Sequence, residues 1–210
     1  MSTTNWLPVL SADSLDAAQQ KVYDRAVKKL EIDPENVPSF VLKMVNVPDL
    51  LKDTYMNVSR HILTGGALKL ETKLIIAATV AGHAGNEEIA SFFADKARAL
   101  EVTDEQLYEA AGIAATSTSY NFYYKFRSLF EGQDFEGFNP GLRASLFMNP
   151  TQGKAFAELV NIVISTINGC KSCVNGHVHD ALGLGITKEQ MDEALRTGSI
   201  VMAMSTFCNA

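Results

Sequence analysis

Hydrophobic residues recur at helical spacing along most of the chain. Residues 14–30 and 191–202 each place their apolar side chains three or four positions apart, so that each stretch forms one apolar helix face. These side chains belong to Leu15, Ala18, Val22, Ala26 and Leu30, and to Met191, Ala194, Leu195, Gly198 and Met202. Sustained two-residue alternation is hard to find. The pattern predicts a nearly all-α protein.

Glycine and proline residues separate the predicted helices, because both residues favour helix ends and turns. Helices are expected over about residues 14–30, 86–100 and 152–167, and another begins after Gly169. The breakers lie at residues 34–38, 48, 65–66, 82–85, 137–141, 150–153, 169 and 183–185. The first of these helices is expected to cover the core or a neighbouring subunit.

Two matching capping boxes indicate an internal repeat. Thr103 is followed three residues later by Gln106, and Thr187 is followed in the same way by Gln190, 84 residues further along the chain. Carried upstream, the offset makes each half read helix, glycine break, helix, capping box, helix. We therefore expect a single domain over residues 1–210. It comprises an N-terminal helical extension (1–35), a first repeat (about 36–130) and a second repeat (about 131–210).

Composition and charge narrow the partners. The chain is 47% hydrophobic and 20% charged, with a formal net charge of -6. Nucleic acids and anionic membranes attract a clustered positive field, which this sequence lacks, so small molecules or proteins are the expected partners. The most apolar stretches, residues 74–81 and 159–167, are shorter than a membrane span, and the first residues do not resemble a secretory signal. A cytoplasmic location is expected.

Candidate chemistry gathers in one short segment, INGCKSCVNGHVHD, residues 167–180. It holds two of the three cysteines and two of the four histidines. In a helix that starts after Gly169, Cys170, Cys173 and His177 share one stripe, and Glu158 on the preceding helix can fold back onto it. The first repeat has no reactive group at the positions paired with these four residues, which are Leu74, Asn86, Ile89 and Phe93. The chemistry therefore belongs to the second half alone.

Two physical arguments disagree on which thiol is the nucleophile. A helix N-terminus lowers a cysteine pKa, which favours Cys170. A histidine one turn away can act as a base, which favours Cys173. In either case the second thiol can capture a sulfenic acid as a disulfide, which an external dithiol reopens. A Cys-x-x-Cys of this kind fits a reducing compartment.

The two cysteines also allow other interpretations. The cysteines can be small buried residues, or zinc ligands together with His177 and either His179 or Asp180. A closed zinc site usually draws its ligands from two separated elements, whereas these all come from one short helix. Elsewhere, His83 is expected to be structural, His179 to lie at the surface and Cys208 to pack as a small hydrophobe.

The run from Glu158 to His177, ELVNIVISTINGCKSCVNGH, resembles the active-site segment of the alkylhydroperoxidase D (AhpD)-like family in the carboxymuconolactone decarboxylase superfamily. The family pattern is Glu, eleven residues, Cys-x-x-Cys, three residues, His, and every spacing is met here. The likeness extends through NFYYKFRSLFEG (121–132) and NPGLRASLFMNP (139–150), and so covers the chain from about residue 120 onward. Residues 1–115 match only in helical outline.

The resemblance implies an all-helical AhpD-like fold with a two-fold repeat, trimeric or hexameric assembly, and reduction of hydrogen peroxide or small alkyl hydroperoxides. By position, Cys173 is the peroxidatic cysteine, Cys170 is the resolving cysteine, and His177 and Glu158 relay protons. The pair cycles between dithiol and disulfide without a bound cofactor. An external dithiol, by analogy a lipoyl group on a partner protein, is the implied reductant.

One position departs from the family. Ser172 stands where AhpD proteins carry a histidine directly before the second cysteine. A hydroxyl can pass a proton but does not titrate near neutral pH, so Ser172 is a candidate relay of a shorter kind. Three other functions remain open: a disulfide oxidoreductase, a redox-sensing switch, and a lactone decarboxylase, whose chemistry does not use a Cys-x-x-Cys.

Overall fold

The computed structural model describes residues 6–130, 137 and 139–210, and within these ranges all regular secondary structure is helical, as the hydrophobic pattern predicts. The helices are η1 (Ala12–Ser14), α1 (Ala17–Lys29), α2 (Ser39–Met44), α3 (Pro48–Asn57), η2 (Val58–Ile62), α4 (Leu70–His83), α5 (Glu87–Arg98), α6 (Asp104–Leu129), α7 (Ser145–Met148), α8 (Lys154–Ile167), α9 (Lys171–Gly183) and α10 (Lys188–Cys208). In the described ranges, none of them combines the length and the apolar character needed to cross a membrane.

The predicted helices over residues 14–30, 86–100 and 152–167 are confirmed as α1, α5 and α8, with ends that differ by at most three residues. Residues 131–136 and 138 lie outside the described residues. Part of the glycine break predicted at residues 137–141, and the repeat boundary predicted near residues 130 and 131, fall on these positions. The single-domain organisation and its three parts stay a prediction.

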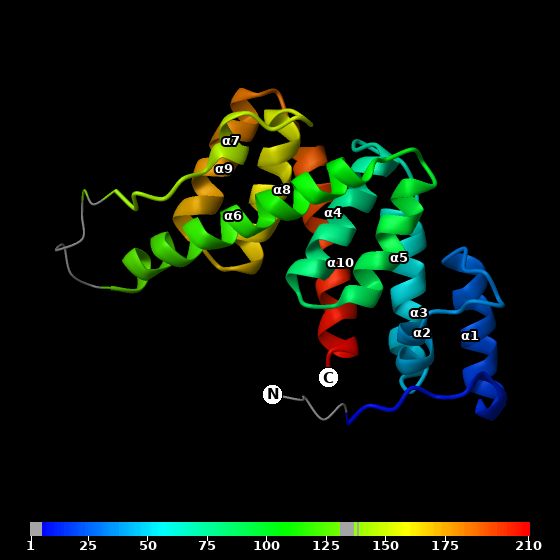
Figure 1. Ribbon diagram of the computed structural model, residues 1–210. Helices are drawn as coiled ribbons and strands as arrows, with labels where there is room; N and C mark the ends of the chain where they lie inside the picture. The colour runs from blue at the N-terminus through cyan, green and yellow to red at the C-terminus, as the bar shows by residue number, and fades with distance from the viewer. Residues whose placement is uncertain (1–5, 131–136, 138) are drawn as a thin grey trace.

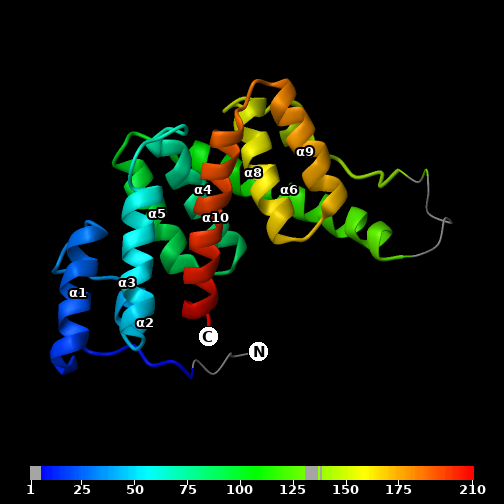
Figure 2. The same ribbon diagram turned by 180° about the vertical axis from the view of Figure 1, so that it is seen from behind.

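The core is built where α4, α6, α8 and α10 meet. Figures 1 and 2 show α1–α3 on one side of these helices and α9 on the other. Helix α4 is buried continuously from Lys73 to Ala81, and α8 from Leu159 to Ser165. Each fully buried Leu, Ile or Phe side chain contributes roughly 1.5–3 kcal/mol to stability. Helices α4 and α8, which lead to the two glycine turns, are thus the most deeply buried elements.

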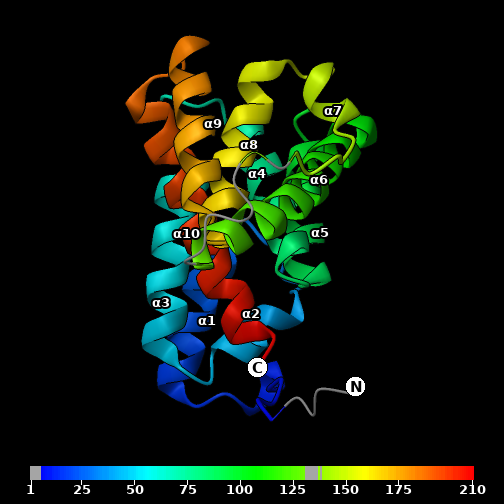
Figure 3. The ribbon, with the colours of Figure 1, turned by 90° about the vertical axis from the view of Figure 1, so that its left-hand side faces the viewer.

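A glycine permits a close helix crossing in this core. Helix α10 packs against both α4 and α8, as the side view in Figure 3 shows. A Cβ atom at Gly198 would lie 2.6 Å from Cγ1 of Val163, a distance that side chains do not tolerate. The absence of a side chain at Gly198 therefore brings α10 against α8.

Side-chain caps define the helix starts. Thr103 and Thr187 form the two predicted capping boxes with Gln106 and Gln190, which confirms those local predictions. A third box, between Asp16 and Gln19, starts α1 and was not anticipated. Each box satisfies backbone N–H groups that a helix start leaves unpaired.

Three glutamates cap helix starts or turns far away in the sequence. The carboxylate of Glu193 on α10 accepts hydrogen bonds from the N–H groups of Ala67 and Leu68, at 3.0 and 2.9 Å, just before α4. Glu109 on α6 accepts from the N–H groups of Thr151 and Gln152, at 2.5 and 3.0 Å, just before α8. Helices α6 and α10 thereby hold the turns that lead into α8 and α4, respectively.

The third glutamate attaches the N-terminal layer. Pro38, at the start of α2, has no side-chain acceptor with which to cap that helix. Glu88 of α5 takes this role and accepts from the N–H groups of Ser39 and Phe40, at 2.5 and 3.0 Å. Lys43, also on α2 and only 4% exposed, donates to the carbonyl of Cys208 at the end of α10. Helix α2 is thus held against α5 and α10.

Candidate functional site

The turn between α8 and α9 places both cysteines. Asn168 ends α8, and Gly169 follows with a φ angle of 66°, a conformation that glycine adopts without strain. Cys170 is the N-cap residue of α9, and its N–H donates to the carbonyl of Ser165 at 3.0 Å. Cys173 therefore lies in the first turn of α9, where unpaired N–H groups favour a thiolate.

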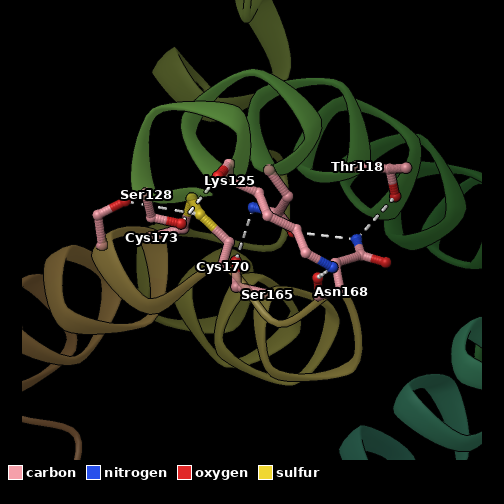
Figure 4. Close-up of a disulfide and its surroundings, with 9 residues drawn as sticks. Thr118, Lys125, Ser128, Ser165, Asn168, Cys170 and Cys173 are labelled. Carbon is pink, nitrogen blue, oxygen red and sulfur yellow. Dashed lines mark hydrogen bonds between the residues drawn. A yellow bond between two sulfur atoms is a disulfide. The ribbon is translucent and has the colours of Figure 1, made fainter. Parts of the chain in front are cut away.

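The two cysteines are joined by a disulfide, and their Cα atoms lie 5.3 Å apart. Figure 4 shows the disulfide beside α6, with Lys125 and Ser128 on that helix and Ser165 and Asn168 on α8 and the turn. Cys170 is 0% exposed, whereas Cys173 is only partly buried and lines a pocket. The two sulfur atoms therefore differ in their access to a small molecule.

Glu158 folds back onto the cysteine helix, as its spacing predicts. Its Oε2 lies 2.7 Å from Nδ1 of His177, and the two side chains are 17% and 19% exposed. An ionised carboxylate accepts hydrogen bonds only, so Nδ1 carries the proton and Nε2 remains for a substrate or a thiol. Phe147 packs edge-on against the imidazole, with 6.3 Å between ring centroids. The ring is thus oriented from two sides.

Cys173 and His177 open into a pocket of about 270 Å³ between α6, α7 and α9. The pocket is lined by Tyr120, Asn121, Tyr124, Phe147, Ser172, Cys173, Gly176, His177 and Asp180. The hydroxyl of Tyr120 donates to the carbonyl of Leu142 at 2.6 Å, which ties α6 to the segment before α7. Sequence reasoning missed this aromatic wall, because its residues come from two elements and share no regular spacing.

Ser172, the candidate relay, is exposed and lines the same pocket. Its Oγ lies 3.7 Å from Sγ of Cys170, within the range of a weak hydrogen bond to sulfur. The Ser172 hydroxyl therefore contacts the sulfur of the buried cysteine.

Asp180, an alternative zinc ligand in the sequence, lines this pocket, whereas His83, His179 and Cys208 do not. Nε2 of His83 is 3.1 Å from Oδ1 of Asn168, so this histidine has the structural partner that was expected. His179 is exposed, as predicted. Cys208 is buried at the end of α10, and burial raises the pKa of its thiol to about 12. Cys208 is thus a packed, unreactive thiol.

No metal-binding cluster is found in the part of the chain that the structure describes: no three His, Cys, Asp or Glu side chains gather closely enough to hold an ion. The zinc alternative would need Cys170 and Cys173 as thiolates, yet here they form the disulfide.

A polar network that the sequence did not reveal surrounds Asn168. Its side-chain amide donates to Oδ1 of Asn121 at 3.0 Å and to Oγ1 of Thr118 at 3.4 Å. Its backbone carbonyl accepts from Nζ of Lys125 at 2.8 Å. Asn121 in turn donates to Oγ of Ser165 at 3.0 Å. Helix α6 thereby fixes the turn that carries Cys170 (Figure 4).

The fold and the site define an all-helical protein with a Cys-x-x-Cys disulfide beside a half-buried Glu–His pair. Residues 138–208 match the model of the carboxymuconolactone decarboxylase family. A relative from Mycobacteroides abscessus, named alkyl hydroperoxide reductase AhpD, is 30% identical over 159 residues, which cover 76% of this chain and 89% of the relative. The chain belongs to the carboxymuconolactone decarboxylase family.

Further relatives carry the same name. The alkyl hydroperoxide reductase AhpD of Frankia alni is 32% identical over 114 residues, 52% of this chain and 62% of that protein. The one of Anaeromyxobacter dehalogenans is 28% identical over 157 residues, 75% of this chain and 83% of that protein. The predicted resemblance to AhpD proteins is thereby confirmed.

Proposed function

We propose that this protein is a thiol-dependent peroxidase that reduces hydrogen peroxide or small alkyl hydroperoxides. The names of its relatives support this activity. The observation that carries the proposal is the unequal access of the two cysteines. Cys173 lines the pocket together with His177, whereas Cys170 is buried. That arrangement suits Cys173 as the peroxidatic cysteine and Cys170 as the resolving cysteine.

The first step oxidises Cys173. In the reduced protein, Nε2 of His177 accepts the proton of the Cys173 thiol, and Glu158 stabilises the imidazolium through the 2.7 Å contact at Nδ1. The thiolate attacks the terminal peroxide oxygen, and the O–O bond breaks. Cys173 becomes a sulfenic acid, and the leaving alkoxide takes the proton from His177 to depart as an alcohol, or as water when the substrate is hydrogen peroxide.

The second step closes the disulfide. The thiolate of Cys170 attacks the Cys173 sulfur, the S–S bond forms, and the sulfenic oxygen leaves as water after protonation. Ser172, with Oγ 3.7 Å from Cys170 Sγ, is placed to pass on the proton that Cys170 loses, and the departing sulfenic oxygen takes up that proton as it leaves as water. An external dithiol then reduces the disulfide to two thiols and is itself oxidised to a disulfide. No bound cofactor is needed.

The reductant is proposed to be a dithiol, for which a lipoyl group on a partner protein is the leading candidate. A pair that must be re-reduced in every cycle requires a reducing compartment, which supports a cytoplasmic location. We further propose that the protein forms a trimer or hexamer. Sedimentation at equilibrium checks this against the chain mass of 22.9 kDa; a monomeric mass at micromolar concentration contradicts it.

Consumption of tert-butyl hydroperoxide with dihydrolipoamide tests the activity. The wild type is expected to turn over many times. Cys173→Ser is expected to be inactive, and Cys170→Ser to react once with peroxide and stop as the sulfenic acid, detected by mass. If the wild type forms the disulfide but does not turn over, the peroxidase proposal fails, and a disulfide oxidoreductase or a redox switch replaces it.

We also propose that the fold is an internal duplication. Helices α4, α5 and α6 start at residues 70, 87 and 104. Adding the offset of 84 gives residues 154, 171 and 188, at which α8, α9 and α10 start. The carboxylates of Glu109 and Glu193 obey the same offset, as do the N–H groups that they bind. Each half thus caps the other through equivalent residues, which supports a two-fold repeat.

A further inference from the structure

Lys125 holds the turn that leads into the resolving cysteine. Its Nζ donates to the carbonyl of Asn168 at 2.8 Å and lies 3.6 Å from the position that a Cβ atom on Gly169 would occupy. Figure 4 shows Lys125 reaching from α6 toward this turn, beside the disulfide. A positive charge therefore lies against the two residues that directly precede Cys170.

The equivalent turn in the half without cysteines is held by a neutral side chain. At the offset of 84, Lys125 corresponds to Asn209, and Asn168 corresponds to Ala84. Nδ2 of Asn209 donates to the carbonyl of Ala84 at 2.8 Å, the same distance as in the other half. An amide is thus sufficient to hold this turn. The cation occurs at the turn that carries the cysteines, which suggests that its charge serves them.

Within residues 6–130, 137 and 139–210, the charge of Lys125 is not neutralised by an ion pair. Among the described residues, no carboxylate lies within ion-pair distance of its Nζ. The other charged or ionisable side chains around the turn and the pocket belong to His83, Lys171, Asp180, the Glu158–His177 pair, Tyr120 and Tyr124. Lys171 is exposed to solvent, whereas Lys125 is partly buried. Water and salt therefore screen the electrostatic effect of the Lys125 ammonium less than that of Lys171.

The two sulfur atoms are unequally buried, and a nearby positive charge would stabilise the thiolate of the buried one. An external dithiol can reach Cys173, which lines the pocket, so its attack expels Cys170 as a thiolate. Cys170 is 0% exposed, and burial disfavours an unpaired anion. The same thiolate must form again when Cys170 attacks the sulfenic acid. Both steps need stabilisation of a buried anion.

We propose that Lys125 is a positioning residue whose ammonium, held on the carbonyl of Asn168, favours the thiolate of Cys170. It thereby shifts the Cys170–Cys173 couple toward the dithiol. The inference rests on the proposed redox function of this pair. Electrons and atoms balance: the external dithiol loses two electrons and two protons and becomes a disulfide, while Cys170 and Cys173 gain them.

Three substitutions separate the charge from the hydrogen bond. Lys125→Gln keeps a donor without the charge, Lys125→Met keeps neither, and Lys125→Arg keeps both. The first readout is the equilibrium between the protein and reduced and oxidised dithiothreitol at pH 7, measured by alkylation and mass. The second is the ultraviolet absorbance of the Cys170 thiolate, followed against pH in a Cys173→Ser background. Lys154→Met, an exposed site at the far end of α8, is the control.

We expect Lys125→Gln and Lys125→Met each to lower the equilibrium constant for reduction about tenfold, which corresponds to about 30 mV for a two-electron couple. The pH at which the Cys170 thiolate appears should rise by about 1 in both, which corresponds to a tenfold weaker ionisation. Lys125→Arg and Lys154→Met should stay within about twofold of the wild type. The inference is overturned if Lys125→Gln behaves as the wild type, if no variant changes, or if Lys125→Arg shifts as far as Lys125→Met.

No peroxide enters these measurements, so they are independent of the peroxidase assay. A protein that fails to turn over peroxide but shows the expected shifts loses the proposed function and keeps this inference. A protein that turns over peroxide with unchanged equilibria in all variants loses this inference alone.

Discussion

The proposed proton relay depends on the contact between His177 and Glu158. His177→Ala removes the proposed base and should slow oxidation of Cys173 by peroxide about 10²- to 10³-fold at pH 7. Glu158→Gln keeps a side chain of the same size but no longer stabilises the imidazolium, so a smaller loss, about tenfold, is expected. Stopped-flow measurement of a single turnover, started with pre-reduced protein, gives both rates.

The matched control for this pair is His179→Ala, because His179 is exposed, lies outside the pocket and is on the same helix. It should leave the single-turnover rate unchanged. An equal loss in His177→Ala and His179→Ala would show that the substitutions perturb α9 as a whole, and the proposed relay would be withdrawn.

Cys208 makes a pH-dependent contribution to stability. Burial raises the pKa of its thiol to about 12, whereas a cysteine in the unfolded chain ionises near 8.5. Its raised native pKa means that the contribution is complete below about pH 8.5 and is lost as the pH rises toward 12. The free energy of unfolding of the wild type, relative to Cys208→Ala, should fall by about 2 kcal/mol between pH 8 and pH 10.

Urea denaturation of both proteins at pH 8, 9 and 10 measures this difference. Because both proteins share every lysine and tyrosine, their titration cancels in the comparison. A difference that stays constant across this range would mean that the Cys208 thiol ionises equally in the folded and unfolded chains.

At the scale of the elements, the carboxylate caps are the testable feature. Glu193 binds two N–H groups and lies 3.0 Å from Nζ of Lys73, which is only 3% exposed. Removing the charge in Glu193→Gln leaves that ammonium buried without a counter-ion, at a cost of about 3 kcal/mol. Glu109→Gln loses charge-assisted hydrogen bonds alone and should cost about 1–2 kcal/mol. Chemical denaturation at pH 7 ranks the two.

The pH dependence of this cap follows from the pKa of Glu193. Burial by itself raises that pKa. The hydrogen bonds from Leu68 and Lys73 together lower it by more than burial raises it, so the pKa of Glu193 lies below its usual value. Its stabilisation is therefore present above about pH 4.3 and is lost as the pH falls through the lower native pKa. Asp53→Asn, at an exposed position on α3, should change stability by less than about 0.5 kcal/mol. Equal costs for Glu193→Gln and Asp53→Asn would contradict the cap.

The elements that the sequence predicted are those defined by local chemistry. Helix starts at Thr103 and Thr187 follow from capping boxes, and Glu158 was found because its helix partner is separated from it by one short turn. The contacts of Lys125 with Asn168 and of Phe147 with His177 join residues 43 and 30 positions apart. Such pairs arise from how helices cross, which neither periodicity nor capping encodes.

At the scale of the whole molecule, the crossing of the helices explains how the turn at Asn168 and Gly169 is held in place. Helix α6 packs on α8 and α9, while α10 packs on α4. The turn at Asn168 is therefore fixed by side chains of α6 and by His83 at the end of α4, none of which belongs to the α8–α9 hairpin. The hairpin does not need the disulfide to keep its place.

The reduced protein should accordingly remain folded. The disulfide joins residues only three positions apart, and so small a loop constrains the unfolded chain by about 2 kcal/mol at most. For a chain of this length, reduction should lower the melting temperature by roughly 4–8 °C or less. Circular dichroism with and without tris(2-carboxyethyl)phosphine measures the shift, and the double variant Cys170→Ser, Cys173→Ser should show none. Loss of cooperative melting on reduction would make the disulfide a structural staple, and a catalytic cycle that passes through the dithiol would then be untenable.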